Sequence, residues 1–427
     1  MLSSKIIKLD FPIFTHHPDL VYLDSAATTL KPQAVIDAEK EYLEQYSSNV
    51  GRGLYPLAET ATEKFEAVRK QVSAFIGAKG PQEIVFTAGT TASINLVAQL
   101  IEKSLFSAIP ADEPESRSRI KSGMTKANIV TTELEHHSNF LPWKELARAK
   151  DATFRVVPIT EDGLIDLEAL RNSIDDHTRV VAFSAVSNVL GTISPVSEIV
   201  AMIKSINPKT IILIDAAQAI GHAPMDVSKW NADFVAFSAH KMFGTTGVGI
   251  LYGKKTLLET LRPVIFGGGM VLDACAKKTL YRESPYCFEA GTQNIGGVIA
   301  LGAAIKYIEN IGRENIRVHE TALTAYTLKR LRETFGKHIR IIGPGEASER
   351  GGIVAFSLKD IHPHDIAQLL GERNICVRAG EHCAAPLHRK FHLNATTRVS
   401  LSIYNDEKDI DKLVARLEEI SEIMSNT

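Results

Sequence analysis

The chain has 427 residues, which is enough for one large domain and one smaller domain that each bury a core. The 48 lysines and arginines nearly balance the 50 aspartates and glutamates, which argues against nucleic-acid binding or disorder as a property of the whole chain. The four cysteines are too few for a disulfide scaffold, and no apolar stretch approaches the roughly 20 residues that span a bilayer. We expect a cytoplasmic protein that contacts neither nucleic acid nor membrane.

Short apolar runs alternate with helical patterns through the first two thirds of the chain. Residues 62–76 carry apolar side chains at helical spacing, and the apolar run at 83–86 ends in a Thr-Ala-Gly-Thr-Thr turn before a second helical pattern begins. Further strands are predicted at 128–132, 154–159, 179–186 and 210–215. This alternation predicts an α/β fold whose mostly parallel sheet is covered on both faces and binds ligands at the carboxyl ends of its strands.

The pattern of predicted helices and strands changes near residue 295. A long helical stretch from Ile299 to about Phe335 precedes shorter strands and two more helices, which is typical of a smaller α+β domain. We predict an N-terminal segment at 1–20 that packs with the small domain, a large domain at 21–295 and a small domain at 296–427. The polar residues 108–126 are predicted to be an exposed insertion.

Two polar residues follow consecutive apolar runs and are expected at adjacent strand ends. Asp215 ends the run IILID, and Lys241 follows the next run, DFVAFSAH. Asp215 fits either a helix N-cap or a partner for a protonated pyridine nitrogen, with Gln218 one turn further on to bond a ring substituent. A partly desolvated lysine has a lowered pKa and forms Schiff bases. Together, Asp215, Gln218 and Lys241 predict pyridoxal 5'-phosphate as the cofactor.

The same cofactor requires donors for its phosphate and a partner for its ring. Thr90 and Thr91 begin a predicted helix, and Ser238 and His240 lie next to the lysine, so these four residues are candidates for the phosphate site. Individually each also fits a plain turn or a packed side chain. His136 follows the predicted strand at 128–132 and can stack on a flat ring or move protons. Metal ligation is the competing interpretation, although adjacent histidines point apart.

Three further candidates concern a substrate and a nucleophile. Asn188 follows another strand, where its amide can bond a ring hydroxyl or a carboxylate, or can simply form a turn. Cys383 lies in the loop RAGEHCAAP beside Arg378, where its thiol is either a partly ionised nucleophile, an inert surface cysteine or a ligand of a weak zinc site. Arg398 begins a predicted strand and suits a bidentate clamp on an amino-acid carboxylate.

A series of motifs, in order along nearly the whole chain, includes YLDSAATTLKP, ATEKFEAVR, EHHSNFLPW, IDAAQAIGH, SAHKMFGTTGVGILYG, FEAGTQN and RAGEHCAAP. With these motifs the chain resembles the pyridoxal-phosphate-dependent cysteine desulfurases of the class V aminotransferase group, in the SufS/CsdA-like branch. The resemblance implies the aspartate aminotransferase-like fold type I. Two positions depart from the pattern of the family: Tyr55, where a histidine is usual, and Glu381, which places a carboxylate two residues before Cys383.

The resemblance also implies a role for each candidate residue. Lys241, Cys383 and His136 would be catalytic, with Asp215 on the pyridine nitrogen and Gln218 on the ring hydroxyl. The residues implied for the phosphate are Thr90, Thr91, Ser238 and His240, with Thr292 reaching into the other subunit of a homodimer. The residues implied for the substrate carboxylate are Asn188, Arg378 and Arg398.

The implied reaction converts L-cysteine to L-alanine and leaves a persulfide on Cys383, which a SufE-like or other sulfur-acceptor protein collects for iron–sulfur cluster supply. An alternative is a selenocysteine lyase, or another pyridoxal-phosphate aminotransferase or lyase of class V, that does not need Cys383. A cofactor-free sulfur-trafficking protein is disfavoured, because the set of Lys241, Asp215, Gln218 and His136 would then have no use.

Overall fold

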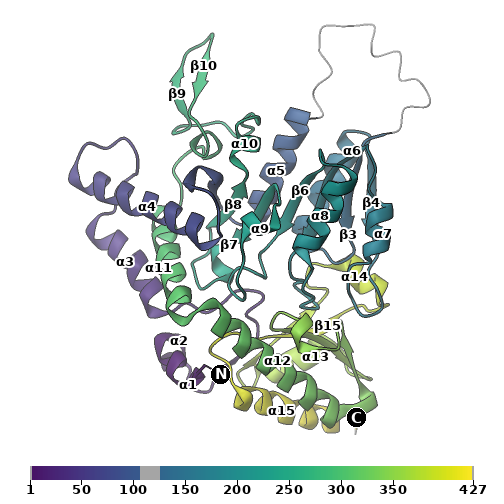
Figure 1. Ribbon diagram of the computed structural model, residues 1–427. Helices are drawn as coiled ribbons and strands as arrows, with labels where there is room; N and C mark the ends of the chain where they lie inside the picture. Colours follow the sequence, from purple (N-terminus) through teal and green to yellow (C-terminus); the bar gives the residue numbers. More distant parts are fainter. Residues whose placement is uncertain (1, 106–125, 426–427) are drawn as a thin grey trace.

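The computed structural model in Figure 1 describes residues 2–105 and 126–425. Apart from its last residue, the insertion predicted at 108–126 lies outside the described residues. A seven-stranded sheet forms the centre of the larger part of the molecule. Its strands, in order across the sheet, are β2 (Ile84–Thr87), β8 (Gly249–Gly253), β7 (Phe234–Ser238), β6 (Ile211–Asp215), β5 (Thr178–Ser184), β3 (Asn128–Thr132) and β4 (Thr153–Val157). Strands β7, β6, β5, β3 and β4 pair in parallel, and β8 is antiparallel to both of its neighbours.

Helices cover both faces of this sheet, because its central strands are apolar on both sides. In β5, Val181 and Phe183 belong to one buried core, whereas Val180 and Ala182 belong to another. The helices of this part are α3 (Gln33–Gln45), α4 (Pro56–Phe75), α5 (Thr90–Leu105), α6 (Leu141–Ala149), α7 (Leu167–Asn172), α8 (Val196–Ile206), α9 (Val227–Trp230) and α10 (Lys255–Leu258). Helices α5 and α6 pack on one face, and α4 and α8 on the other. The carboxyl ends of the parallel strands therefore remain the place where polar groups can gather.

A smaller, four-stranded antiparallel sheet lies below the large sheet in Figure 1. Its strands, in order, are β11 (Ile339–Ile342), β12 (Ile353–Leu358), β15 (Thr396–Ser400) and β14 (Arg378–Gly380). The helices around it are α12 (Arg313–Phe335), α13 (Pro363–Gly371), α14 (Ala385–Lys390) and α15 (Glu407–Ser425). A third apolar core fills this part, and α12 and α15 run side by side across it (Figure 1).

The stretch predicted to be helical from Ile299 to about Phe335 is helical, but the chain forms two helices there. Helix α11 (Ile295–Ile311) ends at Gly312, whose φ of 87° no helix residue adopts, and α12 starts directly after it. No single helix in the described residues is long and apolar enough to cross a membrane. The bent pair of Ile295–Ile311 and Arg313–His338, at 73° to each other, passes that test by length and composition only.

The N-terminal segment is anchored to both parts of the molecule. It contains the short helices α1 (Ser4–Ile7) and α2 (Ile13–His16). Phe11 is fully buried with its ring edge-on to Phe243, Tyr307 and Tyr404, and Lys8 pairs with Asp409 at 3.0 Å. The next strand, β1 (Val21–Tyr22), pairs in parallel with β13 (Ile375–Cys376). The division of the chain at residues 20 and 295 stays a prediction.

A buried ion pair joins α4 to the loop before α11. Arg69 is 1% exposed, and its Nη1 and Nη2 atoms donate to Glu289 Oε1 and Oε2 at 2.6 and 3.0 Å. The Arg69 guanidinium also lies over the Phe86 ring, and the Phe86 N–H donates to Glu289 at 2.7 Å. Both residues fall in motifs that carry the family resemblance. Their pairing holds strand β2, which leads to the turn before Thr90, against α4.

We expect Glu289→Ala to lower the free energy of unfolding by about 3–5 kcal/mol, because the buried Arg69 loses its main carboxylate partner. Urea unfolding followed by circular dichroism measures the change. Lys64→Ala, which breaks the exposed pair with Glu41 at 2.8 Å, serves as the control and should cost about 1 kcal/mol or less. Equal losses in the two variants would contradict the assignment.

Candidate active site

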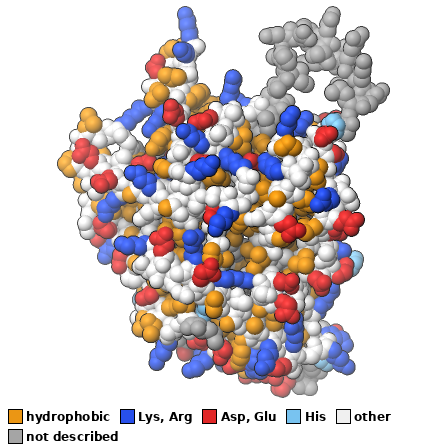
Figure 2. All heavy atoms as spheres, viewed as in Figure 1, with side chains coloured by type: hydrophobic (Ala, Val, Ile, Leu, Met, Phe, Trp, Pro, Cys, Tyr) orange, Lys and Arg blue, Asp and Glu red, His pale blue; other side chains and the backbone are white. Residues whose placement is uncertain are grey.

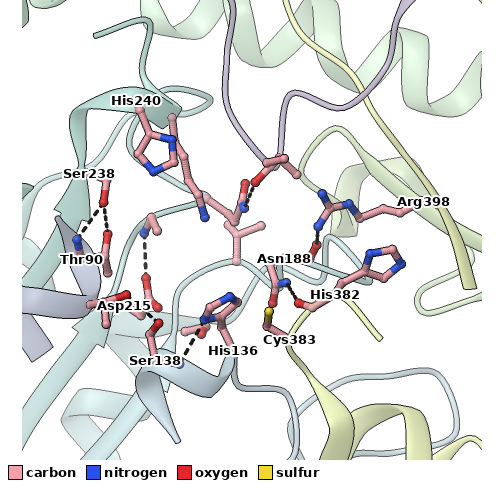
Figure 3. Close-up of a pocket in the computed structure, with 18 of the residues that line it drawn as sticks. Thr90, His136, Ser138, Asn188, Asp215, Ser238, His240, His382, Cys383 and Arg398 are labelled. Atoms are coloured by element: carbon pink, nitrogen blue, oxygen red, sulfur yellow. Dashed lines mark hydrogen bonds between the residues drawn. The ribbon is translucent and has the colours of Figure 1, made fainter. Parts of the chain in front are cut away.

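A cavity of 260 Å³ opens at the carboxyl edge of the large sheet, where the small sheet faces it (Figure 3). It collects every site residue predicted from the sequence except Thr292. Those residues are Thr90, Thr91, His136, Asn188, Asp215, Gln218, Ser238, His240, Lys241, Arg378, Cys383 and Arg398. The segments that reach it include the ends of β3, β5, β6 and β7, the start of α5, and the loop after β14. The size suits a small ligand held by several polar groups.

Asp215 and Lys241 lie at the ends of the neighbouring strands β6 and β7. Asp215 is the last residue of β6 and is paired in register with Ala236. Its Oδ1 accepts from the Ala217 N–H at 2.9 Å and so holds the turn after β6, but no helix begins there, so the N-cap alternative is wrong. Burial lowers the pKa of Lys241 to about 8, although the Asp215 carboxylate acts in the opposite direction. Burial in turn raises the pKa of Asp215, and Ala217 and Lys241 oppose that rise.

The start of α5 forms a cluster of donors beside β7. The Thr90 N–H donates to Ser238 Oγ at 2.7 Å, and the hydroxyls of Thr90 and Ser238 are 2.6 Å apart. Thr91 Oγ1 lies 2.7 Å from Ser138 Oγ. Gly249 permits this arrangement, because a Cβ there would lie 2.3 Å from the Gly89 backbone. Backbone N–H groups at a helix start, with hydroxyls around them, suit a phosphate.

The imidazole rings of His136 and His240 line the cavity, and both are uncharged near neutral pH. Ser138 N–H donates to His136 Nδ1 at 3.1 Å, so the neutral ring carries its proton on Nε2. Burial, helped by the charge of Lys241, lowers the pKa of His136 to about 4. Burial and the charges of Lys241 and Lys31 likewise lower the pKa of His240 to about 4. Neither imidazole adds charge to the cavity near neutral pH.

One buried acceptor of the cavity is available to a hydroxyl group of a ligand. Gln218 Nε2 donates to the Ala26 carbonyl at 2.8 Å, whereas its Oε1 is buried and has no hydrogen-bond partner among the described residues. A buried acceptor without a partner can receive a hydrogen bond from a donor group of a ligand. With the Asp215 carboxylate, the Lys241 amine and the donors at Thr90, the cavity offers groups for a cationic ring nitrogen, an aldehyde and a phosphate.

The opposite wall of the cavity carries two arginines that share one aspartate. Arg398 donates from Nη1 to the Asn188 carbonyl at 2.8 Å and from Nη2 to Asp24 Oδ1 at 2.9 Å. Its Nε is buried and, within the described part of the chain, lacks a partner. Arg378 Nη1 lies 4.0 Å from Asp24 Oδ2. Two cations against one carboxylate leave this wall positive, which suits the carboxylate of an amino acid.

Cys383 lies in the exposed loop between β14 and α14, and this loop borders the same cavity. His382 and Cys383 both have left-handed backbones, with φ of 50° and 58°. Asn188 Nδ2 donates to the His382 carbonyl at 2.8 Å, so the amide of Asn188 binds the loop (Figure 3). The His382 ring in turn contacts Thr396, with Nε2 3.0 Å from Oγ1. The thiol is thereby held on a loop and beside the cavity.

The sequence missed several residues that complete the site, and one candidate lies elsewhere. Thr292 is exposed outside the cavity of its own chain, with its hydroxyl 3.4 Å from Asn49 Nδ2. Glu135 was missed, although four donors converge on its buried carboxylate. Glu135 lies behind the cavity and does not line it; the lining residues that were not predicted are Ala26, Ala27, Ser138, Ser184, Val186, Ala217 and His382. Most of them stand within motifs that the sequence already singled out. Among the described residues, no group of three or more His, Cys, Asp or Glu side chains could hold a metal ion.

A lysine and a carboxylate at adjacent strand ends, beside hydroxyls at a helix start, define a pyridoxal-phosphate-dependent enzyme of fold type I. The sequence matches the aminotransferase class-V family over residues 21–113 and 116–413, and the chain belongs to that family. It is 43% identical over 424 residues to a probable cysteine desulfurase of Streptomyces coelicolor, covering 98% of this chain and 97% of that one.

Solved structures agree with this placement. A cysteine desulfurase from Thermococcus onnurineus is 36% identical, with a TM-score of 0.89 over 98% of each chain. The cysteine desulfurase CsdA from Escherichia coli is 31% identical, with a TM-score of 0.86 over 99% of each chain. The predictions of the family, the fold class and pyridoxal 5'-phosphate as the cofactor are confirmed.

We expect Lys241 in the cofactor-free protein to react with an acylating reagent at a lower pH than exposed lysines. Only the unprotonated amine reacts, and a pKa of about 8 leaves far more of it unprotonated near neutrality than the usual value of about 10.4. Asp215→Asn should move the midpoint to still lower pH, because the Asp215 carboxylate raises the pKa of Lys241. Mass spectrometry of the peptide that contains Lys241, after acylation at a series of pH values, gives the midpoint pH of the reaction in each protein. A midpoint pH that is higher in Asp215→Asn than in the wild type would contradict the assignment.

Proposed function

We propose that the chain is a cysteine desulfurase, which converts L-cysteine to L-alanine and holds the released sulfur as a persulfide on Cys383. One observation carries the proposal: an exposed thiol borders the same cavity as Lys241 and Arg398. The cavity thus combines a site for the cofactor, a positive wall for an amino-acid carboxylate, and a nucleophile. The names of the relatives in Streptomyces coelicolor and Thermococcus onnurineus support the same activity.

The cofactor would be held by residues from four strand ends. When bound, pyridoxal 5'-phosphate supplies an electron sink next to the Cα of an amino-acid substrate. Lys241 would carry it through Nζ, Asp215 would pair with its ring nitrogen, and the orphaned Gln218 Oε1 would accept from its ring hydroxyl. His136, with its proton on Nε2, would lie against the ring. The residues proposed for its phosphate are Thr90, Thr91, Ser238 and His240.

The substrate would be oriented by the positive wall. Arg398 and Arg378 would bind the carboxylate of L-cysteine, which satisfies the orphaned Nε of Arg398. Asn188 would complete this positive wall on the side of the large sheet, because the Asn188 carbonyl already accepts a hydrogen bond from Arg398. Lys241, partly unprotonated near neutral pH, then takes the proton from the substrate Cα and later returns it.

Sulfur transfer would follow at Cys383. Its thiolate attacks the substrate sulfur, and the new S–S bond forms as the Cβ–S bond breaks. The electron pair of the broken bond stays with the carbon fragment, which takes up a proton at Cβ and leaves as L-alanine. L-cysteine and one thiol therefore give L-alanine and one persulfide, with no external oxidant or reductant.

We expect Cys383→Ser to lose both L-alanine and protein-bound persulfide, while the cofactor remains bound. Anaerobic incubation with L-cysteine, with both products followed by mass spectrometry, makes the comparison with the wild type. The matched control is Cys275→Ser, because Cys275 is also exposed but lies on the hairpin formed by β9 (Val271–Ala274) and β10 (Thr279–Tyr281). Alanine that persists in Cys383→Ser would instead favour a lyase or aminotransferase, and turnover of L-selenocysteine by that variant would favour a selenocysteine lyase.

We also propose a homodimer, with Thr292 completing the site of the other subunit. Apolar side chains are exposed on the β9 (Val271–Ala274) and β10 (Thr279–Tyr281) hairpin and before α4, with Leu54 94% and Leu272 66% exposed. Figure 2 shows hydrophobic side chains gathered near this hairpin and at the start of α4. Exposed patches of this kind favour association. Thr292 lies close to the same region, since it contacts Asn49.

The homodimer predicts complementation between two inactive variants. In a mixed dimer of Lys241→Ala and Thr292→Arg chains, one site combines the intact Lys241 of one chain with the intact Thr292 of the other. Unfolding and refolding an equal mixture should therefore restore about a quarter of the wild-type activity, since half of the dimers are mixed and each has one intact site. An inactive mixture that still sediments as a dimer would contradict the role of Thr292.

The persulfide would pass to a SufE-like or other sulfur-acceptor protein in the cytoplasm, for iron–sulfur cluster supply. The support for an acceptor is the position of Cys383, whose exposed loop leaves the thiol accessible from outside.

A further inference from the structure

His137 makes two contacts with the loop of Cys383, through its backbone and through its ring. The His137 N–H donates to the carbonyl of Cys383 itself at 2.7 Å. The His137 ring accepts, through Nε2, from the N–H of Ala385 at 3.2 Å. One residue thus binds the backbone at the nucleophile and two positions after it.

The loop needs such contacts because its backbone is in an unfavourable conformation. His382 and Cys383 are consecutive residues in the left-handed region, which is uncommon for residues with a Cβ. Conformations of this kind persist only where the surroundings determine them. Among the described residues, the direct contacts from the large sheet to this stretch include Asn188 on His382 and His137 on Cys383 and Ala385.

His137 is itself placed firmly. It begins the short 3-10 helix at His137–Asn139, directly after Glu135 and His136. The buried carboxylate of Glu135 accepts from Asn139 Nδ2 at 2.6 Å and from Ser184 Oγ, which anchors this helix to β5. The segment that carries His136 into the cavity therefore also carries His137 to the loop.

We propose that His137 is a positioning residue that holds the Cys383 loop in its left-handed conformation and so aims the thiol at the substrate sulfur. The proposal rests on the proposed function. His137 does not line the cavity; its side chain faces the groove between α5 and α6. Its effect on the reaction therefore runs through the loop and not through the cofactor or the substrate.

Two substitutions distinguish the hydrogen bond that the His137 ring accepts from the volume that the ring fills. His137→Leu removes the acceptor for Ala385, whereas His137→Gln offers a carbonyl oxygen that can take the place of Nε2. We expect single-turnover persulfide formation on Cys383 to fall about tenfold or more in His137→Leu and to recover at least in part in His137→Gln. His338→Leu, the same change at an exposed histidine on a turn away from the cavity, is the matched control.

A second readout distinguishes positioning of the loop from damage to the site. Exchange of the Cα hydrogen of L-alanine in D2O requires the cofactor and Lys241 but no thiol, so the holoenzyme of His137→Leu should retain it. Amide hydrogen exchange should become faster at Ala385, whose N–H loses its acceptor. Both measurements use the holoenzyme.

Three results would overturn the proposal: persulfide formation that His137→Leu leaves unchanged, L-alanine exchange that falls as far as persulfide formation, or amide exchange at Ala385 that does not change. If His137→Leu does not fold, His137→Gln and its Ala385 exchange still decide the matter, since that variant should protect Ala385. Failure of the proposed function has a different signature: the wild type then forms no persulfide at all, whereas the Ala385 measurement still tests the contact.

Discussion

The site depends on two opposite charges that are held inside the protein at the ends of neighbouring strands. Strands β6 and β7 are buried along their length and covered on both faces, so the charged groups lie where the strands end: Asp215 as the last residue of β6, and Lys241 at the end of the 3-10 helix Ala239–Lys241 that follows β7. Burial disfavours the charged form of each group, and the charge of each supports the other. A lysine with a pKa of about 8 and an aspartate ready to bind a cation follow from this one arrangement.

A second constraint joins three segments that are far apart in the chain. Arg378 and Arg398 stand directly opposite each other on the antiparallel strands β14 and β15, where like charges repel. Asp24, from the segment after β1, contacts both. It offsets part of the repulsion and leaves one positive charge in excess at the mouth of the cavity. The two arginines of the small sheet therefore leave a positive wall that suits an anion, and Asp24 holds both of them in place.

The sequence was sufficient for the elements and for most of the site, because both follow from local patterns. A polar residue directly after an apolar run predicts a strand end, and this pattern located Asp215, Lys241 and Asn188. Contacts between distant segments leave no local signal. The pairing of Glu135 with Ser184, 49 positions later, and that of Arg69 with Glu289, 220 positions later, could not be read from spacing.

Helix boundaries illustrate the same limit. The helical pattern continues through Gly312 without interruption, and only the backbone angle at that residue separates α11 from α12. Thr292 shows a different limit, since its predicted partner belongs to a second copy of the chain. In the structure of one chain, Thr292 lies outside the cavity of that chain, and its predicted contact with the site of the second chain needs both chains.

The two reactive groups of the cavity are held in opposite ways, and the chemistry explains why. In the proposed reaction Lys241 takes a proton from the substrate and returns it, so it gains from a fixed position at the edge of the rigid sheet. In the same proposal Cys383 meets a sulfur inside the cavity and then presents that sulfur to another molecule. A loop whose two left-handed residues depend on hydrogen bonds from Asn188 and His137 suits both of these proposed demands.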